Sequence, residues 1–284
     1  MKHTWTISIF LLVLFFGAQL IGLAILNSYI DLQASAEKNK IVLKPCPIID
    51  CPTSEESPPP ISWLTIIGAV IAGTVLILLI IKFANPLVWK IWFYLAMVLC
   101  LTLALTAFIN FVYALLISLL VGWFKVFKPN IIIHNLSELF IYGGLARMFA
   151  PILDVTYAFL LLIALSFYDM YAVWKSKHMV TMAKFQTESG VFAGLMIPYG
   201  LPSGKGVKRP GRTAVLGGGD IGFPLILAGT VFLEHGFYQA LAISVGASAA
   251  LFILLMLSQK DKFYPAMPFL TMGCALGYLA TLLL

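Results

Sequence analysis

The sequence predicts an all-α polytopic membrane protein with nine transmembrane helices. Of its 284 residues, 61% are hydrophobic and only 11% are charged, and the mean hydropathy is +0.98. Soluble globular proteins are roughly 45–50% apolar and about 25% charged. The apolar residues also gather in long runs, and about 20 of them in a row are enough for a helix to cross a bilayer.

The first apolar run covers residues 7–30. The small residues Ala34, Ser35 and Ala36 behind it resemble a signal-peptide cleavage site. However, the run is longer than the apolar core of a signal peptide, which spans about 7–15 residues. We therefore expect a retained first span.

The other spans follow from the same pattern. A polar loop over residues 31–60 separates the first two spans and holds Cys46 and Cys51, for which a disulfide and two free thiols are equally compatible with the sequence. The block 86–127 is too long for one crossing, so we divide it near Ile109 and Asn110. The remaining spans are expected at residues 61–83, 131–149, 152–174, 213–233, 237–257 and 265–284.

The basic residues predict the orientation. Cytoplasmic loops of membrane proteins are enriched in Lys and Arg. If the N-terminus is internal, all of the 18 Lys and Arg residues lie inside except Lys38, Lys40, Lys44 and Arg147. We therefore predict an internal N-terminus and an external C-terminus. Because the basic residues lie between apolar runs, the net charge of +6 does not indicate nucleic-acid binding.

Two aspartates interrupt the apolar spans. Asp169 lies in the span 152–174 and Asp220 in the span 213–233, and an ionisable group inside a membrane segment is costly and by default marks a functional site. Counted as helix from Lys175 and from Arg212, both carboxylates fall about 9–12 Å beneath the inner interface. We therefore expect them to face each other, with the glycines around Asp220 allowing the two helices to approach closely.

Two facing carboxylates cannot both ionise readily, so such a pair shares one proton. The ionised member can take a proton from an attacking water while the protonated member donates to a peptide carbonyl. This chemistry needs neither a metal nor a covalent intermediate, and we expect no cofactor. From the residues alone, two other readings remain open: buried polar groups satisfied by neighbours, and a proton or ion path.

Three motifs give a more specific indication. They are Tyr168-Asp169, the sequence Gly-Gly-Gly-Asp at 217–220, and Pro-Ala-Met-Pro at 265–268. Together they resemble the YD, GxGD and PAL motifs that the presenilin and signal peptide peptidase family carries on spans 6, 7 and 9. The segment 168–183 is especially similar to archaeal presenilin homologues, and the span count and orientation agree with presenilin.

This resemblance implies an intramembrane aspartyl protease that hydrolyses transmembrane segments of other membrane proteins. It implies that Asp169 and Asp220 are catalytic and that Tyr168, Gly217 and Gly219 support them. It divides the chain into an N-terminal bundle at 1–151, with spans 1–5 and the external loop, and a catalytic part at 152–284, with spans 6–9 and the inner loop 175–212. Archaeal homologues share the short chain, so we expect activity without accessory subunits.

The third motif departs from the family pattern, because Met267 stands where the family has leucine. The change nearly conserves volume, so we expect the turn to keep its conformation. Pro265, Ala266, Met267 and Pro268 are expected to contact the substrate, since the prolines keep local backbone groups out of helical pairing.

A transmembrane substrate must unwind before cleavage, and its backbone then needs new partners. We expect these partners in the apolar, glycine-interrupted segment 189–201, including Val191 and Ile197, which would pair with the substrate as an added strand. The alternative is an interfacial segment that only packs.

Other residues and functions carry less weight. His134 and Glu138 are four residues apart on one face of the span 131–149, and we expect them to pair within the bundle rather than to catalyse. The competing functions are a proton-coupled transporter or ion channel that uses the same carboxylates, and a prepilin-type aspartyl peptidase. A transporter often shows inverted repeats, and none is evident here.

Overall fold

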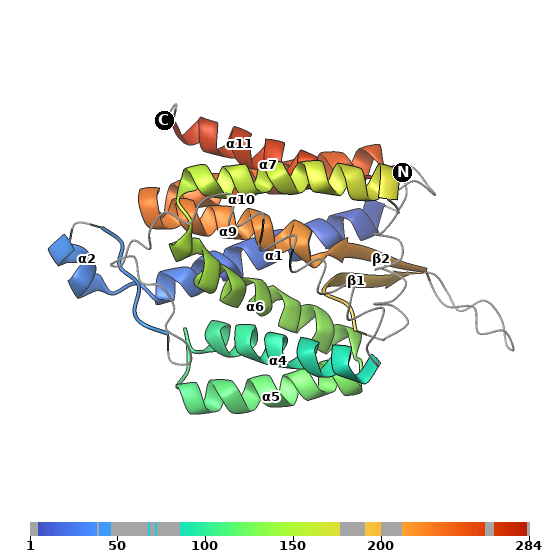
Figure 1. The fold of residues 1–284 in the computed structure, drawn as a ribbon, viewed down its shortest axis with the longest axis horizontal. Coiled ribbons are helices and arrows are strands. Elements are labelled where there is room, and N and C mark those ends of the chain that lie inside the picture. Colours follow the sequence, from blue (N-terminus) through green and yellow to red (C-terminus); the bar gives the residue numbers. More distant parts are fainter. Residues whose placement is uncertain are drawn as a thin grey trace, which may run out of the picture.

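A computed structural model describes residues 5–38, 40–46, 68, 72, 86–176, 191–199, 212–258 and 264–282. Over these residues the chain forms a helical bundle with one β-hairpin (Figure 1). The elements in chain order are α1 (Trp5–Ser28), α2 (Leu32–Lys38), α4 (Pro86–Leu105), α5 (Phe111–Phe127), α6 (Ile131–Phe149), a short 3-10 turn η1 (Ala150–Ile152), α7 (Val155–Tyr171), a π-helical turn η2 (Ala172–Ser176), β1 (Gly194–Tyr199), β2 (Arg212–Gly217), α9 (Gly218–His235), α10 (Phe237–Leu257) and α11 (Met267–Leu282).

Most predicted span boundaries agree with these helices. The predicted break near Ile109 and Asn110 is confirmed, because α4 ends at Leu105 and α5 starts at Phe111. The Asn110 side chain accepts the Val112 N–H at 3.0 Å, which satisfies one of the free donors at the helix start. The predicted span 61–83 lies outside the described residues except for positions 68 and 72, and so does Cys51.

The helices identify a multi-pass membrane protein, although they do not establish all nine spans. Within the described ranges, four helices are long and apolar enough to cross a membrane. Two shorter helices, α5 and α11, are also apolar. The four long segments are Trp5–Ser28, Leu87–Leu105, Val155–Lys175 and Phe237–Leu257.

The start of the predicted span 213–233 is wrong, since residues up to Gly217 form a strand and the helix begins at Gly218. β2 pairs antiparallel with β1, from Gly194 opposite Gly217 to Tyr199 opposite Arg212. Ala214 and Leu216 are buried whereas Thr213 and Val215 are exposed, an alternation that suits a strand with one face on the core. The protein is therefore helical but not strictly all-α.

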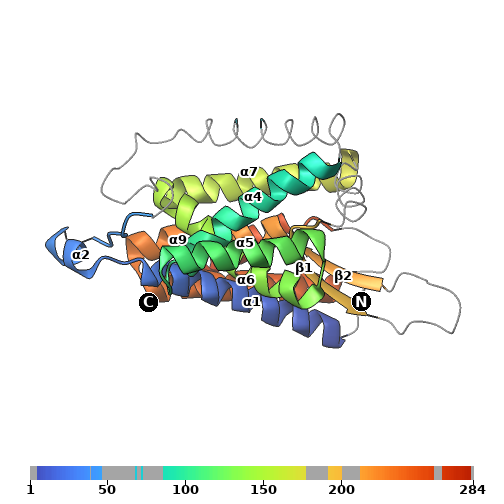
Figure 2. The same ribbon diagram turned by 90° about the horizontal axis from the view of Figure 1, so that it is seen from below.

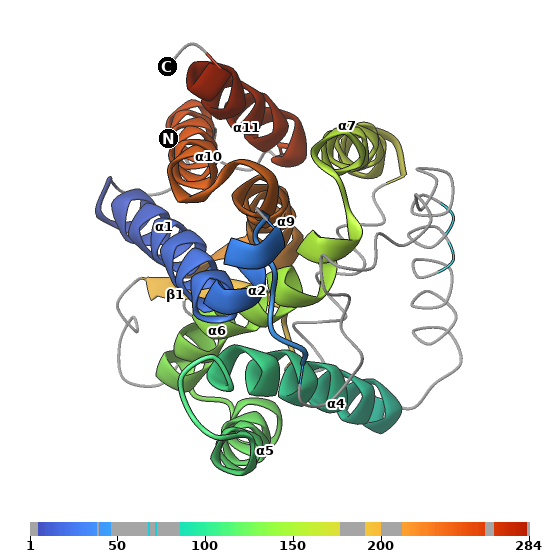
Figure 3. The same ribbon diagram turned by 90° about the vertical axis from the view of Figure 1, so that its left-hand side faces the viewer.

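Helix α9 lies in the middle of the bundle, as Figure 3 shows in a view along the helices. It packs against α1, α6, α7, α10 and α11. From Ile221 to Phe232 every residue of α9 except Phe223 is buried. A helix that is apolar on all sides belongs in the interior of a bundle, so this position follows from its sequence.

The hairpin projects at the end of the bundle where α1 and α9 begin (Figures 1 and 2). The small helix α2 lies at the opposite end, and the start of α1 and the end of α11 are at opposite ends too. The hairpin leads directly into α9. The fold therefore places a sheet edge, a helix start and the end of α7 in one region.

Candidate active site

Asp169 lies near the C-terminal end of α7, just before the π-helical turn. Its side chain is buried, with 9% of its surface exposed. The backbone N–H of Met267 donates to Oδ2 of Asp169 at 3.1 Å, and the Ala266 N–H interacts favourably with the same carboxylate. The third sequence motif therefore contacts the first.

The start of α11 explains why these donors are available. The first helical hydrogen bond runs from the Leu270 N–H to the Ala266 carbonyl at 3.1 Å, and N–H groups ahead of it have no partner within the helix. Pro268 lies in this first turn, where a proline costs the helix nothing. The free N–H groups and the helix dipole favour an anion at this place, and Asp169 occupies it.

Asp220 is the third residue of α9 and is half-buried. Gly217 is the N-cap residue, and a Cβ built on it would lie 3.1 Å from Oδ2 of Asp220. The Asp220 side chain therefore reaches from the third helical position back toward the cap, as in one half of a capping box. The predicted depth of Asp220 assumed a helix from Arg212, and this assumption is wrong, because a strand fills that stretch.

The two aspartates lie on neighbouring helices. Asp169 and Asp220 lie within electrostatic range of each other, on helices α7 and α9 that pack side by side. In the described part of the chain, no Lys or Arg side chain forms an ion pair with either of them. Without a cation between them, two such carboxylates are best accommodated by one shared proton.

Two of the four glycines around Asp220 act differently from the prediction. We expected them to let α9 approach α7, but Gly218 and Gly222 face α6. A Cβ on Gly218 would lie 2.7 Å from Oη of Tyr142, and one on Gly222 would lie 3.3 Å from Leu145. Tyr142 and Leu145 belong to α6, so the close approach is between α9 and α6.

Tyr168, Gly217 and Gly219 lie around the aspartates. Tyr168 and Gly219 are exposed, whereas a Cβ on Gly217 would lie 3.1 Å from Oδ2 of Asp220. A side chain at position 217 would thus crowd the carboxylate. Pro265 is buried and Pro268 half-buried.

Val191 and Ile197, which we expected to contact the substrate, have different surroundings. Val191 is buried, 3% exposed, and packs with Trp89 and Val126. Ile197 is half-buried in β1 opposite Ala214. Val191 therefore attaches the start of this segment to α4 and α5, while Ile197 faces the main core.

His134 and Glu138 both find partners within the bundle, although not each other. His134 Nε2 is 2.7 Å from the carbonyl oxygen of Gly194 in β1. Glu138 accepts instead from Lys125 of α5 and from the hydroxyl of Tyr142. Lys125, Glu138 and Tyr142 are all buried, so this ion pair and its tyrosine lie inside the bundle.

Sequence analysis missed three residues near the site. Asn135 contacts β1, and Tyr142 lies beneath Gly218. Gln19 of α1 is fully buried and donates to the Ile221 carbonyl at 3.0 Å, directly after Asp220. A buried polar side chain in an apolar span was the available signal, but the sequence did not identify the partner.

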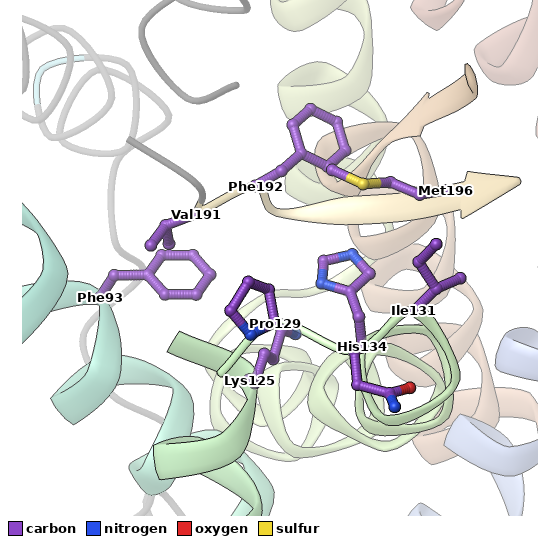
Figure 4. Close-up of a pocket in the computed structure, with 9 residues that line it drawn as sticks. Phe93, Lys125, Pro129, Ile131, His134, Val191, Phe192 and Met196 are labelled. Atoms are coloured by element: carbon purple, nitrogen blue, oxygen red, sulfur yellow. The ribbon is translucent and has the colours of Figure 1, made fainter. Parts of the chain in front are cut away.

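A cavity of about 90 Å³ lies on the α6 side of β1 (Figure 4). It is lined by Phe93 of α4, by His134 and by Val191, Phe192 and Met196 around β1, and it does not include either aspartate. Among the described residues, no group of three His, Cys, Asp or Glu side chains could hold a metal ion.

The bundle thus holds one buried and one half-buried carboxylate at neighbouring helix ends. The family model of signal-peptide peptidase, presenilin aspartyl protease matches residues 51–284, and the chain belongs to this family. It is accordingly an intramembrane-cleaving aspartic endopeptidase. No match was found among curated proteins.

Two solved structures share the fold. Both are crystal structures of a presenilin family intramembrane aspartate protease, in space groups C222 and P2. The first aligns with a TM-score of 0.63 at 19% identity over 97% of each chain. The second aligns with a TM-score of 0.62 at 19% identity over 96% of each chain. The presenilin-like fold predicted from the motifs is confirmed.

Proposed function

We propose that Asp169 and Asp220 are the catalytic residues and that they cleave transmembrane segments of other membrane proteins by activating water. The observation that carries this proposal is the side-by-side packing of α7 and α9, which bear the two aspartates, with the N-terminus of α11 on Asp169. Carboxylate pairs removed from solvent are characteristic of acid–base chemistry.

The reaction follows from one shared proton. The ionised carboxylate takes a proton from water as the water oxygen bonds to the peptide carbonyl carbon, and the protonated carboxyl donates to the carbonyl oxygen. When the tetrahedral intermediate collapses, its C–N bond breaks, the carboxyl that took the proton of water gives it to the leaving nitrogen, and the other carboxylate takes back the proton of the carbonyl oxygen. The pair returns to its starting state with one proton, so no cofactor is consumed.

The substrate must be unwound where it is cut, and the hairpin offers backbone partners. The N–H and the C=O of Met196 in β1 both bond to Asn135 of α6. Met196 and the opposite residue Val215 therefore form a non-hydrogen-bonded pair, so the N–H and the C=O of Val215 point away from β1. We therefore assign the substrate strand to the edge of β2 at Thr213 and Val215. The substrate strand would therefore pair with β2 rather than with the segment 189–201. The turn at residues 265–268 contacts Asp169 through Met267, in addition to any contact with the substrate.

The proposal extends to topology and partners. An internal N-terminus would place the hairpin and both aspartates at the inner side of the membrane. The short chain is proposed to act without accessory subunits on single-span substrates.

Purified protein reconstituted with a single-span peptide tests the mechanism. The parent should cleave, whereas Asp169→Asn and Asp220→Asn should each lose activity by a factor of about 10³ or more, because neither retains a carboxylate pair. Thermal unfolding of each variant provides the control for folding. Robust cleavage by either single variant would refute the two-aspartate mechanism.

A further inference from the structure

The outer edge of β1 is already occupied by a side chain. The Met196 N–H donates to Oδ1 of Asn135 at 2.9 Å, and Nδ2 of Asn135 donates to the Met196 carbonyl at 2.7 Å. Two residues earlier along the same edge, Nε2 of His134 is 2.7 Å from the Gly194 carbonyl oxygen. On the edge of β1 that faces away from β2, the outward backbone groups of Gly194 and Met196 are thus hydrogen-bonded to α6.

The Asn135 carboxamide reproduces the pattern of a neighbouring strand. A peptide unit of an antiparallel strand exchanges one N–H and one C=O with the residue opposite, and a carboxamide carries one acceptor oxygen and two N–H donors. Asn135 therefore closes the edge of β1 that would otherwise present free backbone groups. Among the described residues no hydrogen bond to the outer edge of β2 is found, so a further strand can pair there.

Helix α6 is held firmly enough to serve as this partner. Glu138, one turn after His134 and Asn135, is bonded by Lys125 of α5 and by Tyr142. Tyr142 in turn contacts the turn at Gly218 that begins α9. One face of α6 therefore reaches β1 through Asn135 and the Asp220 turn through Tyr142.

We propose that Asn135 is a positioning residue that acts as a side-chain substitute for a third strand, and that it fixes the register of the hairpin against Asp220. This inference rests on the proposed pairing of the substrate with β2. Asn135 fixes β1, β1 fixes β2 through the observed register, and β2 runs without interruption into Gly217 and α9. The peptide bond that a β2-paired substrate presents to the aspartates is then set by α6.

Asn135→Ala and Asn130→Ala form a matched pair for the test. Asn130 caps α6 by accepting the N–H groups of Ile132 and Ile133, so both changes remove two hydrogen bonds of one asparagine. Asn130 has no recorded hydrogen bond to β1 among the described residues. We expect Asn135→Ala to lower kcat about tenfold at nearly unchanged KM and to broaden the set of cleaved bonds, as read by mass spectrometry of the products. Asn130→Ala should keep the parent cleavage positions. Equal cleavage positions in both variants would overturn the proposal.

Asn135→Asp provides a readout that simple packing would not change. A protonated carboxyl can accept from the Met196 N–H and donate to its carbonyl, as the amide does, whereas a carboxylate can only accept. The activity of this variant relative to the parent should therefore rise as the pH falls. The nearby titratable groups are His134 and Glu138 on α6 and Lys125 on α5. They are present in both the variant and the parent, so their titration largely cancels in the activity ratio. A ratio independent of pH would contradict the proposal.

Hydrogen exchange of the full-length protein separates this inference from the protease mechanism, because it requires no activity. Amides of residues 194–199 and 212–217 should exchange faster in Asn135→Ala than in Asn130→Ala. If these rates rise while Asp169→Asn remains fully active, the hairpin role stands and the two-aspartate mechanism fails. If the rates do not rise, Asn135 does not position the hairpin.

Discussion

The backbone N–H of Met267 donates to Oδ2 of Asp169 at 3.1 Å, although the two residues are 98 positions apart in the chain. The contact joins the start of α11 to the end of α7. It gives the Pro-Ala-Met-Pro turn a direct role in holding a carboxylate, in addition to any contact with substrate. A residue that had been expected to meet the substrate thus acts on the proposed catalytic residue itself.

Met267→Pro removes this donor while the first turn of α11 still accepts a proline. Hydrogen bonds to charged groups contribute about 1.5–3 kcal/mol, so we expect kcat to fall by about 10- to 100-fold. Met267→Leu keeps the N–H and nearly the same volume and should cleave like the parent. Kinetics of the two variants with one substrate decide the matter. Equal rates would show that the hydrogen bond does not contribute.

The shared proton predicts a pH profile. As the pH rises, the pair loses its one proton, both carboxylates are ionised, and no acid remains for the peptide carbonyl. We therefore expect kcat/KM to fall on the alkaline side, and to fall again in acid when both are protonated. Initial rates across the pH range, with the intact fold checked at each point, measure this. Activity that keeps rising beyond about pH 9 would be inconsistent with a shared proton.

Removing either partner of the buried ion pair between Lys125 and Glu138 should lower the stability of the fold strongly. Removing one partner leaves an uncompensated buried charge, which costs about 3–5 kcal/mol. Lys125→Met and Glu138→Met should each lower the thermal unfolding temperature markedly. The double variant should recover most of the loss, because two apolar side chains leave no buried charge. Additive losses in the double variant would argue against this account.

Val215→Pro tests the proposed substrate edge. The Val215 N–H faces away from β1, and proline is tolerated on an edge strand at such a position. The hairpin should persist while one donor to the substrate is lost, so we expect about a tenfold lower cleavage rate. Val215→Ala retains the N–H and serves as the control. If both variants cleave equally well, the substrate does not pair with this edge.

The helices that sequence analysis predicted best have polar boundaries. Residues 131–149 match α6 because Asn130 caps its start, and residues 237–257 match α10 because Gly236 has a φ of 100° that ends the preceding helix. Such boundary residues carry local signals that need no tertiary information.

The stretch before Asp220 could not be assigned in this way. Residues 213–217 continue an apolar run, and average hydropathy does not distinguish a strand from a helix there. The alternating exposure of Thr213, Ala214, Val215 and Leu216 becomes evident only when the core is known. The partners of His134, Asn135 and Glu138 likewise depend on which elements pack against α6, which spacing along one helix does not specify.

The central position of α9 has a consequence for how a substrate is received. From Ile221 to Phe232 this helix is covered on nearly every side by its neighbours, whereas its first turn, with Gly219 exposed and Asp220 half-buried, is more open. Among the described elements, α9 therefore offers an intact substrate helix little free surface beyond its first turn. If Asp220 is catalytic, as proposed, we expect the substrate to reach it by delivering a frayed stretch of backbone to the hairpin end of the bundle. Preference among substrates should then follow how easily a helix comes apart near its terminus, rather than how well its side chains fit a groove.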